Sequence, residues 1–214
     1  MKSPLNRAGK KHRFGKAWMH EHVTDPYVQA AQQQGYRSRA AFKLIELAQK
    51  DRLFRPGLTA VDLGAAPGSW SQVLRERLGP GARIVATDIL PMEPIAGVTF
   101  VQADFTGEEG LRKVETALEG RSVGLVVSDM APNLSGIDAV DQARSVHLAE
   151  LALEFAAAHL QPGGDLAVKV FQGAGLADLE RAVRARFEKV YLRKPKASRD
   201  RSRELFVVAK GFRG

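Results

Sequence analysis

Residues 61–70, VDLGAAPGSW, hold the end of a strand, a turn bracketed by two glycines and the start of a helix. An apolar run over residues 59–63 predicts a buried strand, and residues 69–78 have the spacing of an amphipathic helix. Gly64 and Gly68 let the backbone turn tightly and let a ligand approach it with no Cβ in the way. A strand, a glycine turn and a helix in this order open the nucleotide-type site of a doubly wound α/β sheet. We therefore expect the chain to bind a small molecule that contains adenosine.

The rest of the chain alternates apolar runs with helical patterns. Such an alternation predicts a parallel sheet that helices cover on both faces. The loop between the last two strands is too short for a helix, so we expect these strands to pair as an antiparallel hairpin at one edge. The predicted fold class is α/β and Rossmann-like, with a mostly parallel seven-stranded sheet and one antiparallel edge strand. The predicted strands span about 59–63, 83–88, 98–103, 123–128, 165–171, 189–193 and 204–210, and the predicted helices about 38–50, 69–78, 108–119, 141–160 and 175–187.

Length and composition limit the class of protein. The chain has 214 residues, 44% of them hydrophobic, which fits one domain with a substantial core. No apolar run approaches the roughly 20 residues that span a bilayer, and the basic N-terminus lacks the apolar segment of a secretory signal. The absence of cysteine excludes disulfides and thiolate nucleophiles and agrees with a cytoplasmic protein. We expect a basic, flexible arm over residues 1–30 and a single domain over residues 31–214.

Basic residues are concentrated near the two ends of a chain whose formal net charge is +8. Six lysines and arginines precede the first acid, Glu21, and ten more lie between Arg181 and Arg203. Two basic segments that flank a near-neutral middle predict a polyanionic partner, and a nucleic acid fits best. The alternative is a solvated helix face followed by a flexible tail.

Two carboxylates and one indole are candidates for the adenosine pocket. The turn lacks the third glycine of the dinucleotide fingerprint G-x-G-x-x-G, which argues against a nicotinamide cofactor. Asp88 closes the second strand, where a carboxylate can accept hydrogen bonds from ribose hydroxyls, and Asp104 closes the third, in reach of an adenine amino group. Trp70 would cover the pocket. The alternatives are a strand-end turn for Asp88, a helix N-cap for Asp104 and simple packing for Trp70.

Four charged side chains stand out because of their apolar neighbours or their place at a strand end. Asp129 follows the fourth strand and so points off the carboxyl edge, where doubly wound sheets bind ligands. Lys169 lies in an apolar run that predicts a central strand. Lysine is rarely buried without a partner, and beside Asp129 it would serve as a general base. Lys43 lies in an apolar helical segment, and Glu204 heads the last strand. The alternatives are a solvent-facing strand position for Lys169, a polar helix face for Lys43 and an edge-strand charge for Glu204.

In their sequence contexts these four positions resemble the K-D-K-E tetrad of the FtsJ/RrmJ-type 2′-O-ribose RNA methyltransferases. The contexts are YRSRAAFKL (36–44), SDMAPN (128–133), VKVFQG (168–173) and SRE (202–204). The turn DLGAAPGSW (62–70) is similar to the S-adenosylmethionine motif of that family. The resemblance extends over about residues 30–212, and four spaced motifs together are far more specific than any one of them.

The resemblance implies a Rossmann-like methyltransferase that transfers a methyl group from S-adenosylmethionine to a ribose 2′-hydroxyl, as a monomer and with no metal. The chain is most similar to bacterial members that modify a uridine of large-subunit ribosomal RNA, either free or within the assembled subunit. Lys169 would be the base or the hydrogen-bond acceptor, and Asp129 would orient it near the cofactor. Lys43 and Glu204 would hold the ribose and the ammonium. The implied cofactor residues are Gly64, Ala66, Pro67, Gly68, Trp70, Asp88, Asp104 and Asp129.

Three other functions compete with this interpretation. A nicotinamide-dependent dehydrogenase would share the fold, but the missing glycine and the basic ends argue against it. A non-catalytic RNA-binding protein would explain the charge but not a core lysine beside Asp129. A methyltransferase that modifies the ribose of transfer RNA or of a messenger RNA cap would share the tetrad, so the sequence leaves the target RNA open.

Overall fold

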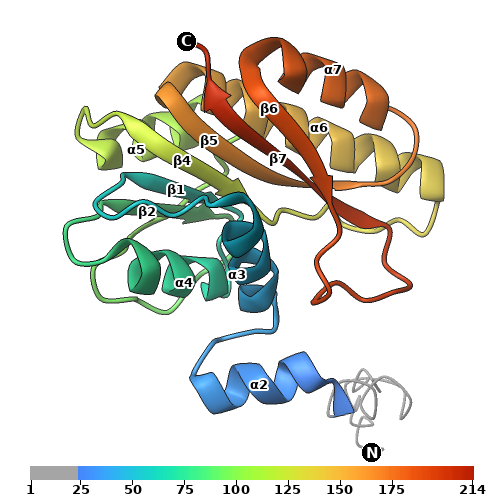
Figure 1. Cartoon of the computed structure of the whole chain (residues 1–214), viewed down its shortest axis with the longest axis horizontal. Coiled ribbons are helices and arrows are strands. Elements are labelled where there is room, and N and C mark those ends of the chain that lie inside the picture. Colours follow the sequence, from blue (N-terminus) through green and yellow to red (C-terminus); the bar gives the residue numbers. More distant parts are fainter. Residues whose placement is uncertain (1–23) are drawn as a thin grey trace, which may run out of the picture.

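The computed structural model describes residues 24–214, and a seven-stranded sheet runs through its middle in the order β3-β2-β1-β4-β5-β7-β6 (Figure 1). Apolar, fully buried strands at the centre of this sheet explain why it lies between two layers of helices. The strands are β1 (Ala60–Leu63), β2 (Ile84–Asp88), β3 (Thr99–Gln102), β4 (Val123–Ser128), β5 (Leu160–Phe171), β6 (Phe187–Arg193) and β7 (Glu204–Phe212).

The first five strands are parallel, and β7 runs antiparallel to both of its neighbours. The predicted α/β class and the mostly parallel seven-stranded sheet are therefore confirmed. The structure refines the predicted edge: the antiparallel strand β7 lies between β5 and β6, and β6 takes the edge position. β7 therefore pairs with both β5 and β6, and it covers the edge of β5 that faces away from β4.

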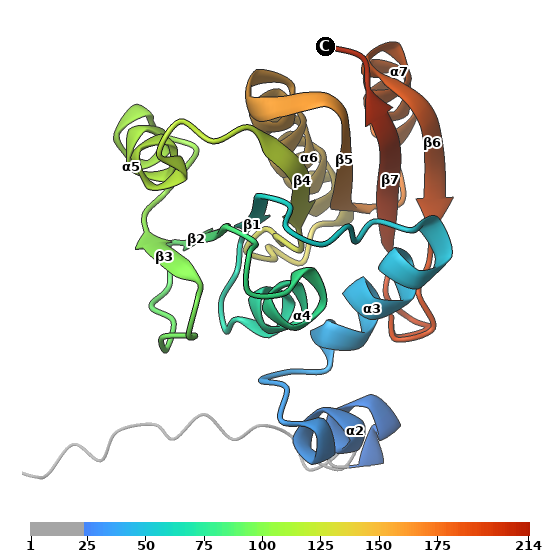
Figure 2. The same ribbon diagram turned by 60° about the vertical axis from the view of Figure 1, so that its left-hand side comes forward.

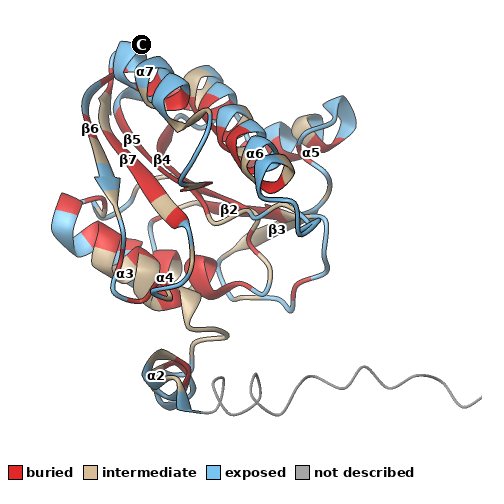
Figure 3. Cartoon of the chain, turned by 90° about the vertical axis from the view of Figure 1, so that its right-hand side faces the viewer, coloured by how far each residue is buried: buried red, intermediate tan, exposed pale blue. Residues whose placement is uncertain are grey.

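Alternate residues of each strand pack against different helices, because side chains of a strand point to opposite faces. Val61 and Leu63 face the cluster formed with α5, α6 and α7, whereas Ala60 faces the cluster formed with α3 and α4. Figure 3 shows the resulting buried sheet between two helical layers. The helices are α2 (Pro26–Gln34), α3 (Ala40–Asp51), α4 (Ser69–Leu78), α5 (Glu108–Leu118), α6 (Asp138–His159) and α7 (Leu176–Arg186).

Helix α2 corrects one expectation, since residues 26–30 were assigned to a flexible arm. The carboxylate of Asp25 caps the helix by accepting hydrogen bonds from the N–H groups of Tyr27 and Val28, and Pro26 begins it. Figure 2 shows α2 set apart from the sheet and its two helical layers, next to α3. Arg39 pairs with Asp25 and also donates to the carbonyl of Ala197, so the helix is tied to the loop before β7. The predicted arm over residues 1–23 lies outside the described residues.

Strand β5 begins five residues earlier than predicted, directly after α6. Pro162, Gly163 and Gly164 favour a turn in sequence, but in the structure they form an irregular start to the strand, where the register against β4 shifts. The change does not move Lys169, which keeps its place near the carboxyl end. No helix in the described part of the chain is both long and apolar enough to cross a membrane.

Candidate active site

The glycine turn directly follows β1, which has β2 on one side and β4 on the other. The order of the strands reverses at this point of the sheet. Gly64 has a φ of +77° and Gly68 a φ of +108°, values that favour glycine. A Cβ at Gly64 would also overlap the Met130 side chain. The backbone N–H groups of Gly64 and Ala65 donate to the Thr87 carbonyl at 2.9 and 3.0 Å. The turn is thus fixed to the end of β2, at the position where doubly wound sheets bind nucleotides.

A cavity of about 540 Å³ opens beside this turn. Its volume lies within the roughly 300–1,000 Å³ of small-ligand sites. Gly64, Ala66, Asp88, Asp104 and Asp129 all line it, together with apolar side chains. The structure therefore brings five of the eight predicted cofactor residues to one cavity. The apolar lining consists of Ile89, Leu90, Phe105, Met130 and Leu148 with smaller residues between them.

Asp88 and Asp104, which are predicted to bind the ribose and the adenine, also accept hydrogen bonds from the protein itself. Asp88 accepts hydrogen bonds from the N–H groups of Ala66 at 2.8 Å and Leu90 at 2.9 Å, so it holds the glycine turn as well as lining the cavity. Asp104 accepts from the N–H and the hydroxyl of Thr106. It is not the N-cap of α5, a position taken by Gly107.

Pro67, Gly68 and Trp70 do not line the cavity. Trp70 is 2% exposed, donates from its indole N–H to the Ala40 carbonyl at 2.8 Å and packs against Phe206. The structure thus supports simple packing for Trp70 and not a cover over the cofactor. Helix α4 points its first turn into the α3 layer, which is why the indole turns away from the cavity.

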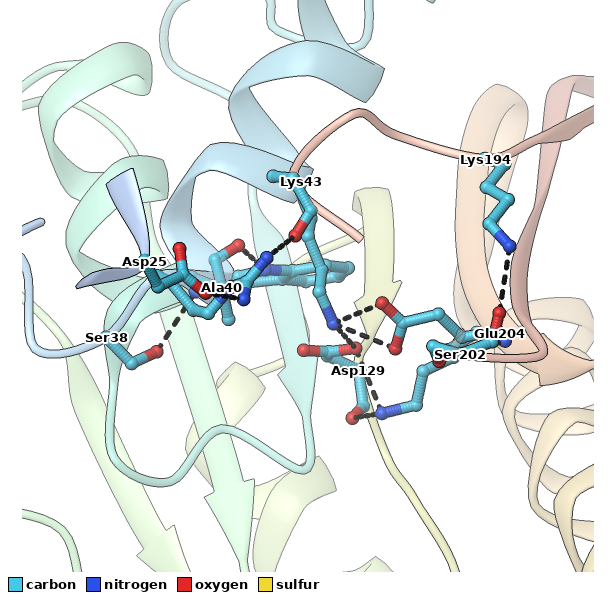
Figure 4. A network of polar contacts seen from close by, with 12 residues as sticks. Asp25, Ser38, Ala40, Lys43, Asp129, Lys194, Ser202 and Glu204 are labelled. Carbon is cyan, nitrogen blue, oxygen red and sulfur yellow. Dashed lines mark hydrogen bonds and ion pairs between the residues drawn. The ribbon is translucent and has the colours of Figure 1, made fainter. Parts of the chain in front are cut away.

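The four tetrad residues meet at the carboxyl edge of the sheet. Figure 4 shows three of them, Lys43, Asp129 and Glu204, pointing toward one another. Lys169 Nζ lies 3.0 Å from Asp129 Oδ1 and donates to the Asp129 carbonyl oxygen at 2.5 Å. Lys43 Nζ lies 2.8 Å from one Glu204 oxygen and 2.9 Å from the other, and 3.8 Å from Asp129 Oδ1. Two ammonium groups and two carboxylates therefore form one continuous network.

Strand register explains why these distant residues converge. Lys169 is paired with Phe206 across β5 and β7, and Glu204 lies two residues before Phe206, so both charged side chains point to the α3 face. Lys43 reaches them from α3. Lys169 is only 7% exposed and Glu204 only 8%, which excludes the solvent-facing alternatives for both. The Lys43 side chain, 12% exposed, is likewise no part of an open polar helix face.

The network controls the charge of Glu204. Burial alone would raise the pKa of Glu204, but the adjacent Lys43 ammonium, which also donates a hydrogen bond to it, outweighs burial and lowers that pKa. Asp129 Oδ1 is buried and accepts no hydrogen bond from the described part of the chain, although Lys169 is near. This oxygen is therefore stabilised by its ion pair with Lys169.

Another buried carboxylate, that of Asp62, has a raised pKa, in contrast to that of Glu204. Asp62 of β1 is 1% exposed and accepts one hydrogen bond, from the Ser71 hydroxyl at 2.6 Å. Burial, more than the nearby charges of Asp129 and Asp88, raises its pKa from 3.8 to about 7. Sequence reasoning assigned no role to Asp62.

Sequence reasoning also missed Arg37, which joins three segments around the glycine turn. Its guanidinium donates to the carbonyls of Pro67 at 2.9 Å, Glu93 at 2.7 Å and Pro94 at 3.0 Å. The position was visible in YRSRAAFKL, but nothing in a sequence shows which distant carbonyls an arginine reaches.

A second cavity of about 550 Å³ lies on the other side of the tetrad. Lys43 and Glu204 line it, so the network separates it from the cavity at the glycine turn. Its remaining lining is basic or small and consists of Arg39, Ala40, Ala197, Arg199, Arg201 and Ser202. Within residues 24–214 no group of three or more His, Cys, Asp or Glu side chains is arranged to hold a metal ion.

Known proteins are similar to this chain in sequence. Residues 36–212 match the model of the FtsJ-like methyltransferase family. A protein of Azoarcus sp. named ribosomal RNA large subunit methyltransferase E is 56% identical over 204 residues, which are 95% of this chain and 100% of the relative. A relative of the same name from Bordetella pertussis is 55% identical over 208 residues, covering 95% and 99% of the two chains.

Solved structures agree with the fold. A Plasmodium falciparum protein described as a ribosomal RNA methyltransferase superposes with a TM-score of 0.75 at 30% identity, covering 84% of this chain and 100% of that one. A Streptococcus mutans protein described as a methyltransferase, crystallised with SAH, has a TM-score of 0.51 at 16% identity and shares the fold alone; it covers 78% of this chain and 97% of that one. The extent and identity of these matches show that the chain belongs to the FtsJ-like methyltransferase family.

Proposed function

We propose that the protein transfers a methyl group from S-adenosylmethionine to a ribose 2′-hydroxyl of large-subunit ribosomal RNA, acting as a monomer in the cytoplasm. The observation that carries this proposal is the buried network of Lys43, Asp129, Lys169 and Glu204, which lies between a cavity at the glycine turn and a basic cavity. The names of the relatives point to the same RNA.

The cavity at the glycine turn suits S-adenosylmethionine. Carboxylates of Asp88 and Asp104 can accept from ribose hydroxyls and an adenine amino group, and aliphatic side chains such as Ile89 and Leu90 can contact the base. Asp129 lines the same cavity, and its carboxylate would offset the positive charge of the sulfonium. When bound, the cofactor supplies an electrophilic methyl group, and the protein supplies position and charge.

The tetrad residues act on the attacking hydroxyl. Lys169, held by the carbonyl and the carboxylate of Asp129, takes the proton of the 2′-hydroxyl or orients the hydroxyl while solvent takes it. Lys43 and Glu204 hold the neighbouring ribose oxygens and keep the ammonium groups in place.

We expect the protein to bind S-adenosylmethionine and not NAD, and Asp88→Ala to weaken this binding by about 1–3 kcal/mol. The substitution removes a ribose acceptor and also frees the N–H of Ala66 in the turn. Titration calorimetry with both ligands measures the effect. Asp178→Ala, which removes an exposed carboxylate of α7 paired only with Arg181, is the control. Tight NAD binding without binding of S-adenosylmethionine would refute the assignment of the cavity.

RNA binding should fall steeply with salt, and part of that dependence should come from the basic cavity. Each neutralised phosphate adds roughly 0.7–0.9 to the slope of log affinity against log salt. Arg199 and Arg201 both line the basic cavity. We choose Arg199→Gln with Arg201→Gln because these substitutions remove two positive charges from that lining, and we expect a slope reduced by about 1–2.

The matched control for this double variant is Arg112→Gln with Arg121→Gln. Both control arginines are exposed and lie near α5, away from the tetrad. Filter binding over a range of salt concentrations gives the slopes. Equal slopes for the two double variants would mean that the basic cavity does not contact phosphates.

The RNA target itself is tested in cells. Mapping of 2′-O-methylation after deletion of the gene should show one missing modification in large-subunit RNA, restored by the wild-type gene. Loss of a ribose methyl group from transfer RNA instead would keep the enzyme class and change the substrate.

A further inference from the structure

Two large apolar side chains are exposed on one short loop beside the tetrad. Leu134 is 71% exposed and Ile137 is 61% exposed. Both belong to the loop 130–137, which joins Asp129 to the start of α6. Single exposed aliphatic residues are common, but two of them three positions apart next to a catalytic group mark a candidate contact surface.

The loop is held in this conformation by hydrogen bonds. The Asp141 carboxylate accepts from the N–H and the hydroxyl of Ser135, both at 2.8 Å, and from the N–H of Gly136 at 3.2 Å. Arg144 donates to the Asn133 carbonyl at 3.2 Å. Turning Leu134 and Ile137 toward the core would break these bonds, so the two side chains are fixed facing outward.

The tip of this loop lies at the rim between the two cavities. Ala131, Pro132 and Asn133 line the cavity at the glycine turn. At the other end Asp138 pairs with Arg203 at 2.7 Å, next to Ser202 and Glu204 of the basic cavity. Leu134 and Ile137 line neither cavity. A nucleotide whose ribose reaches Lys169 must therefore direct its base or that of its neighbour along this rim.

The difference in charge between the loop tip and the basic cavity indicates which part of an RNA each would contact. Residues 133–137, Asn-Leu-Ser-Gly-Ile, carry no charged side chain, whereas the basic cavity on the other side of the network carries several. A phosphate would be drawn to the basic side, and the apolar tip suits the face of an unpaired base. Proteins commonly recognise RNA through such unstacked bases, which stack on aromatic side chains or arginine planes. Aliphatic side chains such as Leu134 and Ile137 can instead cover the apolar face of a base and remove it from water.

We propose that Leu134 and Ile137 form an apolar contact for an unpaired nucleobase, the base of the reacting nucleotide or of the one next to it. This inference rests on the proposed function. The contact keeps the reacting nucleotide out of its stack while the basic cavity holds the backbone, so it fixes the ribose in front of Lys169.

The test is the double variant Leu134→Ser with Ile137→Ser, assayed for methyl transfer to large ribosomal subunits from cells that lack the gene. Both side chains are exposed, so folding should be unaffected. We expect kcat/KM for RNA to fall about tenfold or more, with unchanged affinity for S-adenosylmethionine and an unchanged salt slope. Leu134→Met, which keeps an apolar side chain, should stay close to wild type. Leu192→Ser on β6, where Leu192 is 39% exposed, controls for the loss of exposed apolar surface.

Each other outcome has a definite meaning. Wild-type kcat/KM in the double variant would overturn the inference and leave the proposed function intact. A weaker affinity for S-adenosylmethionine would overturn it in favour of a loop that covers the cofactor. A loss seen with intact subunits but not with protein-free RNA would overturn it in favour of contact with a ribosomal protein. If the wild-type protein itself methylates no RNA, the proposed function is what fails.

Discussion

Lys169→Ala is expected to lower the rate of methyl transfer to RNA by at least about 100-fold, the lower end of the effect of a general base. Lys169 is the network residue that reaches both the carbonyl and the carboxylate of Asp129, at 2.5 and 3.0 Å. Alanine would leave the 2′-hydroxyl without its partner in the transition state, whether Lys169 accepts the proton or only orients the hydroxyl. Affinity for S-adenosylmethionine should change little, because Lys169 does not line the cavity at the glycine turn.

Lys169→Arg should not restore the rate. A guanidinium stays protonated and is planar and larger than an ammonium, so it cannot reproduce contacts in a site where Lys169 is 7% exposed. Single-turnover assays with saturating cofactor measure the rate, and calorimetry confirms that the variants bind cofactor. Lys113→Ala on α5, an exposed lysine paired with Glu109, is the control. A folded, cofactor-binding Lys169→Ala protein that methylates RNA near the wild-type rate would show that Lys169 is not catalytic.

Asp62→Asn is expected to remove a large pH dependence of stability. Burial raises the pKa of Asp62 to about 7 from 3.8, so the folded protein holds this proton more tightly than the unfolded chain. The resulting stabilisation is complete at acid pH, below the unfolded value, and is lost as the pH rises through about 7. Between about pH 5 and about pH 8 the wild type should lose about 2–3 kcal/mol more than Asp62→Asn, which is neutral throughout.

Urea unfolding at the two pH values gives both free energies. The difference between variants isolates Asp62, because all other groups titrate in both proteins. Asp178→Asn, at an exposed carboxylate of α7, should keep the wild-type pH dependence. A loss of stability as steep in Asp62→Asn as in the wild type would mean that Asp62 is already charged in the folded state.

Much of the site could be predicted because its residues lie at the ends of strands, which can be located in the sequence. In a parallel sheet the residues after each strand gather at one edge, so Asp88, Asp104 and Asp129 were placed together by their positions alone. Lys169 was visible because a lysine in an apolar strand needs a partner. The contacts of Lys43 and Glu204 with each other depend on α3 lying across β7, and only the resemblance to a known family brought them together.

Other features depend on packing that no local pattern records. Trp70 turns toward α3 because of the way α4 packs on that helix. The three carbonyls that Arg37 binds belong to two loops that are far apart in sequence. Helix α2 is a different case. Asp25, Pro26 and Gly35 are ordinary start and stop signals. The expectation of an unstructured arm instead follows from the weak apolar periodicity of residues 1–30.

The position of β7 has a consequence for how the chain is made. β5 and β6 are neighbours in sequence but do not pair, because β7, synthesised after both, lies between them. Until residues 204–212 leave the ribosome, β5 presents an open apolar edge, the kind of surface that joins other chains into aggregates. The same strand carries Glu204, the partner of Lys43. A nascent or prematurely terminated chain that lacks residues 204–212 is therefore prone to aggregate and is also without its complete tetrad.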